Sequence, residues 1–163
     1  MPRDREESKG LKIVLYFIKF RPRSEFEVRE KLKQKKIAPP AIEKIVAELK
    51  EKRLLDDGLF AKMWVESRMS AKPMGSFLLI RELRQKGIDK DLAEQVLLNS
   101  NYNELEQAKE AAGRRMRVYK KYQGAEFFEK MVSFLIRRGF NYGIAKEVVE
   151  GLTQDEGEGT VLS

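Results

Sequence analysis

One pattern decides the fold of this chain: it reads LKQKKIAPPAIEKIV at residues 32–46, LRQKGIDKDLAEQVL at residues 83–97 and LIRRGFNYGIAKEVV at residues 135–149. In each copy, apolar residues follow the first leucine five, ten, thirteen and fourteen positions later. The copies begin 51 and 52 residues apart. A regular repeat of this kind is typical of tandem supersecondary units, which bury their apolar faces against one another.

Helix-start and helix-stop signals surround the copies. Ser24 and Glu27 have the spacing of a capping box, and Pro39 suits the first turn of the helix that follows. Gly87 and Gly139 suit the left-handed turn that ends a helix. We therefore predict an all-α fold of nine helices, organised as three tandem three-helix, helix-turn-helix-like repeats that form an elongated, curved array.

The same signals set the predicted domains. Repeat 1 covers residues 9–53, repeat 2 covers residues 54–100 and repeat 3 covers residues 101–152. We expect the two ends, residues 1–8 and residues 153–163, to be disordered, because they are polar chain termini and the C-terminal one is rich in Gly, Asp and Glu.

Composition narrows the possible chemistry. The chain of 163 residues contains no Cys and no His, which removes thiolate nucleophiles, imidazole bases, disulfides and the usual zinc ligands. No predicted helix brings an acid, a base and a nucleophile together, so we expect a protein that is not an enzyme and has no catalytic residue, cofactor or metal. No apolar run approaches membrane-spanning length, and the start MPRDREESKG lacks the apolar core of a secretory signal, so we expect a cytoplasmic protein.

The net charge of +7 belongs to the first third of the chain. Residues 1–55 hold 16 Lys and Arg against 9 Asp and Glu, whereas the remaining 108 residues hold 17 of each kind. A separate cationic run, residues 114–121, has Tyr119 within it and Tyr122 directly after it. Both patches suit a polyanion, because Lys and Arg that neutralise phosphates release condensed counterions. A solvated helix face is an equal alternative for each patch.

The segment LDDGLFAKMWVESR at residues 55–68 resembles the signature of the RecX family of recombinase regulators, in which an Asp-Asp pair precedes Phe-Ala, Trp-Val and Arg. The family's downstream pattern of Gly, Ile, Glu-Leu and Lys-Gly-Ile is matched by Gly75, Ile80, Glu82-Leu83 and Lys86-Gly87-Ile88. The resemblance covers about residues 11–152. The chain departs from the family before the first capping box, where RPRS at residues 21–24 has proline and arginine in place of an aromatic residue.

This resemblance implies a protein that binds the RecA recombinase filament on single-stranded DNA. Members of the family mostly inhibit filament extension, ATPase, strand exchange and co-protease activity, which places them in DNA repair and the SOS response. We expect weaker, salt-sensitive binding to single-stranded DNA itself, and a monomer. The residues expected to contact the filament or the DNA are all cationic: Arg21, Arg23, Lys31, Lys35, Lys36, Arg68, Lys72, Arg114, Arg115, Arg117, Lys120 and Lys121.

A rival function is that of a helix-turn-helix DNA-binding protein acting as a transcriptional regulator, because residues 83–96 contain the short Gly-containing turn of that motif. Charge argues against it. Asp91 and Glu94 follow Asp89 at the start of the helix that would read bases, and only Lys90 offsets these acids. A helix that enters the major groove needs hydrogen-bond donors near its start.

Three features of residues 55–68 leave alternatives open. Asp56-Asp57 can cap free backbone N–H groups at a helix start, which is the interpretation we favour, or hold a metal ion. Trp64 lies in an apolar stripe that favours a core position, but its ring can also stack on a base or anchor a partner. Arg68 can pair with Glu66 or with a neighbouring repeat.

Overall fold

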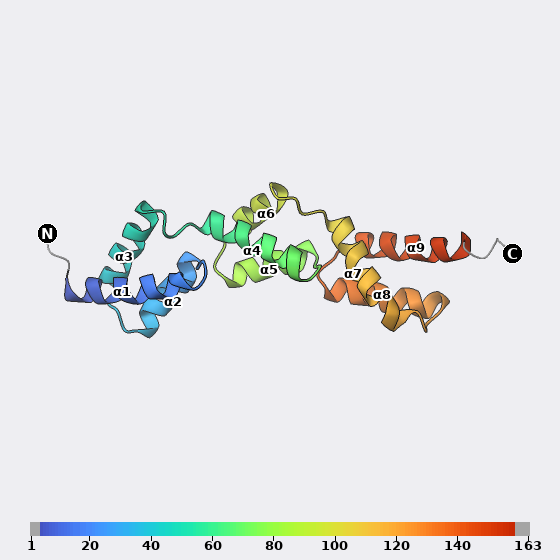
Figure 1. Cartoon of the computed structure of the whole chain (residues 1–163), viewed down its shortest axis with the longest axis horizontal. Helices are drawn as coiled ribbons and strands as arrows, with labels where there is room; N and C mark the ends of the chain where they lie inside the picture. Colours follow the sequence, from blue (N-terminus) through green and yellow to red (C-terminus); the bar gives the residue numbers. More distant parts are fainter. Residues whose placement is uncertain (1–3, 159–163) are drawn as a thin grey trace. The chain divides into compact units, whose positions relative to one another are not determined.

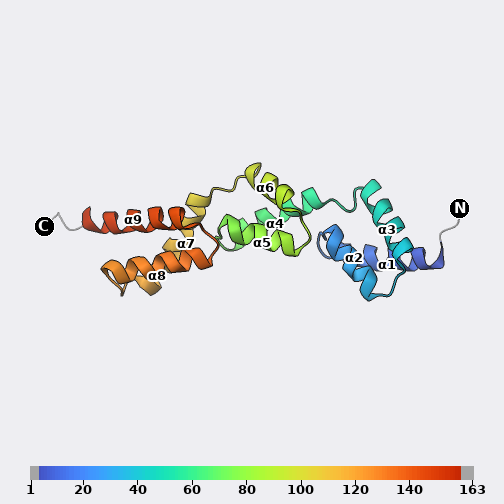
Figure 2. The same cartoon turned by 180° about the vertical axis from the view of Figure 1, so that it is seen from behind.

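A computed structural model describes residues 4–158, with side chains up to residue 155. Within this range the chain forms nine helices and no strand (Figure 1): α1 (Arg5–Lys19), α2 (Glu25–Gln34), α3 (Pro39–Glu51), α4 (Asp57–Ala71), α5 (Ser76–Gln85), α6 (Lys90–Leu98), α7 (Glu104–Tyr119), α8 (Gly124–Arg137) and α9 (Tyr142–Glu158). Figure 2 shows the same helices from behind. The predicted all-α fold of nine helices in three sets of three is confirmed for this part of the chain.

The described chain divides into two compact units. The first contains the described residues up to Met63 together with Leu83–Val96, and the second contains Trp64–Glu82 together with the described residues from Leu97 onward. Repeat 1 therefore lies in the first unit and repeat 3 in the second, whereas the residues of repeat 2 are shared between the two units.

Local sequence signals explain where several helices begin. The Ser24 hydroxyl accepts from the Glu27 N–H at 3.2 Å, and the Glu27 carboxylate accepts from the Ser24 N–H at 3.1 Å, so the predicted capping box is confirmed. Pro39 occupies the first position of α3, where a helix needs no N–H donor. Asn103 caps α7 by accepting from the Glu106 N–H at 3.0 Å.

The repeated apolar positions form the buried cores. The first leucine of each copy, Leu32, Leu83 or Leu135, is fully buried, and of the other repeated positions only Val96 is half-buried. In repeat 1 the leucine belongs to a cluster built by α1, α2 and α3, and in repeat 3 to a cluster built by α7, α8 and α9. Burial of these side chains is the main favourable contribution to folding.

The N-terminal helix begins earlier than predicted. α1 starts at Arg5, inside the segment that we expected to be disordered, because two acids tie its first turn to repeat 1. The Glu6 carboxylate accepts from the Ala38 N–H at 2.9 Å, and the Glu7 carboxylate lies 2.7 Å from the Lys44 ammonium. The prediction of disorder is corrected for these residues. Residues 1–3 lie outside the described part of the chain.

The C-terminal helix ends later than predicted. α9 continues to Glu158, past the expected end at Leu152, and the Thr153 hydroxyl donates to the Glu150 carbonyl at 2.9 Å. The prediction of disorder is therefore corrected for residues 153–158 as well. The last five residues of the predicted tail, 159–163, lie outside the described residues.

Consecutive repeats are joined by a turn that packs on a helix start, and each unit contains one such joint. In the first unit, the turn from α5 to α6 lies against the start of α2. The Ser24 hydroxyl donates to the Lys86 carbonyl at 2.6 Å, the Lys86 ammonium lies 3.2 Å from the Glu27 carboxylate, and a Cβ on Gly87 would clash with the Cβ of Phe26.

The joint of the second unit has the same design. The turn from α8 to α9 lies against the start of α5, where the Gly75 N–H donates to the Arg138 carbonyl at 2.8 Å and the Phe77 N–H donates to the Gly139 carbonyl at 3.2 Å. A Cβ on Gly139 would clash with Leu78. Glycine is required in both turns because the backbone of one repeat touches the helix start of the repeat before it.

Candidate filament and nucleic-acid interface

The richest group of cations and aromatic rings lies where the end of α7 packs beside α8. The Arg115 guanidinium carbon lies 5.4 Å from the centre of the Tyr119 ring and 5.2 Å from that of Phe134. The ammonium groups of Lys121 and Lys130 lie 5.1 Å and 4.6 Å from the centre of the Tyr122 ring. We call this set the α7–α8 patch: Arg115, Tyr119, Lys121, Tyr122, Lys130 and Phe134.

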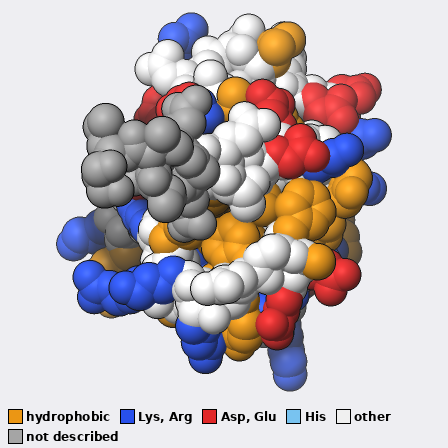
Figure 3. Space-filling model, turned by 90° about the vertical axis from the view of Figure 1, so that its right-hand side faces the viewer, with side chains coloured by type: hydrophobic (Ala, Val, Ile, Leu, Met, Phe, Trp, Pro, Cys, Tyr) orange, Lys and Arg blue, Asp and Glu red, His pale blue; other side chains and the backbone are white. Residues whose placement is uncertain are grey.

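The geometry of the α7–α8 patch suits a single nucleic-acid strand. The Tyr119 ring centre lies 6.2 Å from that of Tyr122 and 6.1 Å from that of Phe134, at interplanar angles of 53° and 77°, so the three rings form one cluster of tilted and edge-to-face contacts. An open hollow of about 310 Å³ beside it is lined by Lys130 and Arg137 among other residues. Viewed from the end of repeat 3, a band of hydrophobic side chains is uncovered, and both Lys/Arg and Asp/Glu side chains surround it (Figure 3). Stacked bases and neutralised phosphates need this combination.

The structure brings together only part of the predicted cationic run. Arg115 and Lys121 belong to the patch, whereas the Arg114 guanidinium pairs with Glu110 at 2.5 Å on the exposed side of α7. Arg117 and Lys120 are exposed and form no cation–π contact with the patch rings within the described residues.

Sequence reasoning missed Lys130 and Phe134 of the patch. The available signal was their spacing of four residues on α8, which puts both on one helix face. Which face of α8 meets α7 depends on packing between the helices.

The predicted cations of repeat 1 are largely engaged within the protein. The Arg23 guanidinium carbon lies 3.8 Å from the centre of the Phe17 ring, and the Lys31 ammonium lies 5.1 Å from it. Burial and the nearby charge of Arg21 lower the pKa of Arg23. Arg21 itself donates to the Glu27 carboxylate at 2.6 Å.

The remaining predicted cations of repeat 1 are solvent-accessible. Lys35 and Lys36 are exposed at the end of α2, and Lys36 has the left-handed backbone with φ 59°. Exposed cations of this kind can contact phosphates without losing an internal partner.

In repeat 2, Arg68 and Trp64 share one carboxylate. The Arg68 Nε–H donates to the Glu82 Oε2 at 2.8 Å, and the Trp64 Nε1–H donates to the same oxygen at 3.0 Å. The Arg68 guanidinium carbon lies 4.6 Å from the centre of the indole ring. Arg68 therefore pairs with Glu82, and the half-buried Trp64 is a packed platform for a cation instead of the core side chain that we predicted. Lys72 is exposed just beyond α4.

The Asp56-Asp57 pair caps two helices. The Asp56 carboxylate accepts from the Leu59 N–H at 3.0 Å, and the Asp57 carboxylate accepts from the Glu25 N–H at 2.8 Å. Burial raises the pKa of Asp57, although the hydrogen bond from Glu25 opposes this change. The favoured capping interpretation is confirmed. The described residues contain no group of three or more acidic side chains placed to hold a metal ion.

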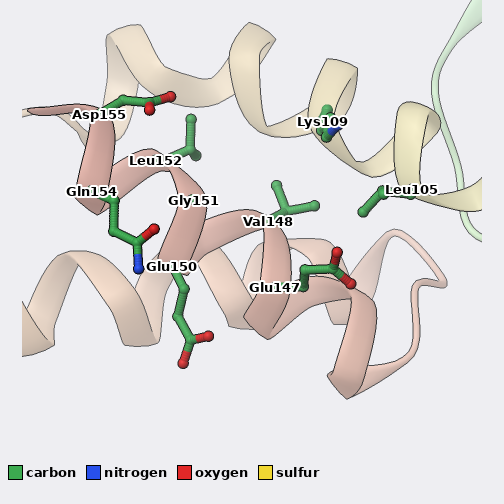
Figure 4. Close-up of a pocket in the computed structure, with 9 residues that line it drawn as sticks. All are labelled: Leu105, Lys109, Glu147, Val148, Glu150, Gly151, Leu152, Gln154 and Asp155. Atoms are coloured by element: carbon green, nitrogen blue, oxygen red, sulfur yellow. The ribbon is translucent and has the colours of Figure 1, made fainter.

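A hollow of about 560 Å³ between α7 and α9 is lined mostly by acidic side chains among its charged residues, in contrast to the cationic α7–α8 patch. Figure 4 shows Val148 and Leu152 pointing from α9 toward α7. Glu147, Glu150 and Asp155 also line this hollow, so its negative charge disfavours phosphate. Within the described chain, none of the helices combines the length and the apolar character that crossing a membrane requires.

Comparison with known proteins relates every repeat to one family. The models of the first, second and third three-helix domains of RecX match residues 11–49, 56–97 and 102–149. The regulatory protein RecX of Finegoldia magna is 34% identical over 139 residues, which cover 83% of this chain and 68% of the relative. That of Streptomyces coelicolor is 30% identical over 160 residues, covering 98% and 85%.

Solved structures agree with this relationship. The crystal structure of RecX from Lactobacillus salivarius superimposes with a TM-score of 0.83 at 25% sequence identity, covering 91% of this chain and 97% of that one. A second RecX crystal structure, at 23% identity, has the same fold with a TM-score of 0.79. The repeated helices, the joints between them and these likenesses lead to one conclusion: the chain belongs to the RecX family of regulatory proteins.

Proposed function

We propose that this chain binds the RecA recombinase filament on single-stranded DNA and restrains it, lowering filament extension, ATPase, strand exchange and co-protease activity. Membership of a family of regulatory proteins supports a regulatory role. The observation that carries the DNA part of the proposal is the α7–α8 patch, which brings three neighbouring aromatic rings together with cations that form no ion pair within the described residues. We also propose that the protein acts in the cytoplasm as a monomer and without catalysing a reaction.

Separate helical repeats suit a polymeric target. Several small contacts on one chain can engage neighbouring protomers at the same time, which raises the overall affinity without requiring one strong contact. Among the predicted contact residues, Lys35, Lys36, Lys72 and Arg117 are exposed cations available for such contacts.

A function as a helix-turn-helix reader of bases is less well supported. At the start of α6, Asp89 and Asp91 are exposed, and the Lys90 ammonium lies 3.7 Å from the Glu94 carboxylate. A reading helix would bring these acids into the major groove, where they would repel the phosphates on both sides.

The decisive experiment measures ATP hydrolysis by the recombinase of the same host on single-stranded DNA. We expect hydrolysis to fall at concentrations of this protein that are too low to occupy free DNA, because the main target is the filament. Binding to naked DNA is measured in parallel by fluorescence anisotropy. Unchanged hydrolysis at concentrations that saturate DNA would contradict the proposal.

A further inference from the structure

A groove of about 530 Å³ in the first unit leaves several large apolar side chains uncovered. It is lined by the end of α1 with the residues after it, and by the turn from α3 into α4 with the first turns of α4. The exposed fractions are 66% for Phe20, 49% for Leu54, 53% for Leu59 and 42% for Met63. Single exposed apolar residues are common, but four of them in one groove indicate an interaction surface.

The rim of this groove is strongly cationic. Lys19, Arg21, Arg23 and Arg53 stand around it, against the single carboxylate of Asp56. Within the described residues, Lys19 and Arg53 form no ion pair and no side-chain hydrogen bond with another side chain. The Asp56 carboxylate is already occupied by the Leu59 N–H. An occupant of the groove therefore gains most if it is acidic.

Arg53 also has an unfavourable backbone. Its φ is 55°, in the left-handed region where the conformational free energy of glycine is lower than that of a residue with a Cβ. Within the described residues, the exposed Arg53 side chain has no ion pair and no hydrogen bond that would offset this cost. Because Lys36 ends α2 with the same left-handed backbone, this conformation marks a helix end, and what Arg53 offers a ligand is an exposed cation on the edge of the apolar groove.

We propose that this groove binds an acidic segment of a partner protein, which inserts apolar side chains over Leu54, Leu59 and Met63 and places carboxylates against Lys19 and Arg53. The exposed apolar lining consists of Leu54, Leu59 and Met63 with one exposed ring, that of Phe20, and it suits the apolar side chains of a peptide. A nucleic-acid strand gains more from several neighbouring rings, and the α7–α8 patch brings three together. The proposal does not rest on the recombinase function, because its test contains no recombinase, and DNA enters the test only as the alternative ligand.

The test uses the full-length protein and a fluorescein-labelled amphipathic peptide of Glu and Leu, with fluorescence anisotropy as the readout. We expect binding that weakens as salt is added. The same peptide with Lys in place of Glu, or with Ser in place of Leu, should not bind. Binding of the Lys peptide as tightly as the Glu peptide would overturn the proposal, because the cationic rim would then have no role.

Two variants locate the peptide in the groove. Arg53→Gly should lower the affinity for the Glu peptide about threefold, which is the size expected for one exposed ion pair, and it should raise the midpoint of thermal unfolding. Leu59→Glu should lower the affinity for the Glu peptide about tenfold or more, because the substitution removes an apolar contact and adds a charge of the same sign as the peptide. Glu suits the first turn of α4, so this variant should stay folded.

Lys12→Ala is the matched control, since Lys12 is an exposed cation on α1 that does not line the groove. It should bind the peptide as the unsubstituted protein does. Equal peptide affinity in all variants would overturn the proposal. An Arg53→Gly protein that loses affinity for an oligothymidylate but keeps its affinity for the peptide would overturn it too, and would assign the groove to nucleic acid.

Discussion

Lys36, Gly87 and Gly139 occupy the same position in the three repeats, and all have positive φ, at 59°, 79° and 91°. Gly87 and Gly139 cannot carry a Cβ, because it would meet the helix start of the preceding repeat. Lys36 belongs to the first repeat, and its side chain is exposed. A cation is therefore tolerated at this one position of the three, at the cost of backbone strain.

This difference predicts opposite effects of substitution. Lys36→Gly should raise the free energy of unfolding by about 0.5 to 1 kcal/mol, since relief of left-handed strain exceeds the entropy that glycine adds to the unfolded chain. Gly139→Ala should lower it by at least about 2 kcal/mol, through strain and a clash with Leu78. Urea unfolding followed by circular dichroism measures both. A Gly139→Ala protein as stable as the unsubstituted one would contradict the close packing of this joint.

Glu27 predicts a pH dependence of stability. Burial acts to raise its pKa, but hydrogen bonds from Arg21, the Ser24 N–H and Lys86 outweigh burial and lower the pKa below the usual 4.5. A carboxyl group whose pKa is lowered by folding stabilises the fold above its unfolded-state pKa, and this contribution is lost as the pH falls through the folded-state value.

We therefore expect Glu27→Gln to lower the free energy of unfolding by about 1 to 2 kcal/mol at neutral pH. Well below the ordinary pKa of 4.5, the difference between the two proteins should shrink toward zero, because the carboxyl group is then protonated in the unsubstituted protein as well. Urea unfolding of both proteins at neutral pH and at a pH well below 4.5 measures this difference in the free energy of unfolding. The same difference at both would mean that the charge of Glu27 does not stabilise the joint.

At the scale of helices, the sequence predicted well that the nine helices of the described residues exist and roughly where each begins and ends, because capping residues and helix breakers act locally. The Ser24 capping box and the Pro39 helix start are decided within a few residues. The ends were predicted less well: the first turn of α1 is held by Glu6 and Glu7 against residues more than thirty positions away. A local pattern contains no information about such partners.

The candidate site was predicted only in part for the same reason. The cationic run on α7 is visible in the sequence, but Lys130 and Phe134 join it only because one face of α8 packs beside the end of α7. Conversely, Arg23 and Arg68 have the charge expected of a nucleic-acid contact, but they are engaged with Phe17 and with Glu82. Net charge does not distinguish a free cation from one that has an internal partner.

The α7–α8 patch leads to a prediction about salt dependence. If about five phosphates are neutralised, the log–log slope of single-stranded DNA affinity against salt should be about −3.5. Replacing Arg115, Lys121 and Lys130 by Ala should reduce the magnitude of this slope by about 2, because three counterion-releasing contacts are lost. Lys146→Ala on α9 is a control of similar exposure, and it should leave the slope unchanged. An unaltered slope in the triple variant would make the patch a solvated helix face.

At the scale of the whole molecule, the first helical residue of repeat 2 and of repeat 3 completes the joint to the repeat before it. Asp57, the first residue of α4, accepts from the N–H of Glu25, the first residue of α2. Glu104, the first residue of α7, accepts from the hydroxyl of Ser76, the first residue of α5, at 3.0 Å. The same acid-to-helix-start contact therefore recurs once in each unit.

These contacts within each unit matter for the proposed regulation, because a protein that touches several protomers of a filament benefits from contacts that are already held in position. Glu104→Ala should loosen the joint of the second unit while leaving every residue of the α7–α8 patch in place. We expect the concentration that half-inhibits the recombinase ATPase to rise about threefold to tenfold, with little change in affinity for naked single-stranded DNA. Glu106→Ala is the matched control, because Glu106 lies on the same helix and its carboxylate forms only an exposed ion pair with Lys109 at 3.2 Å. If Glu104→Ala inhibited as well as the control, the repeats would act on the filament independently, and the joints would serve folding alone.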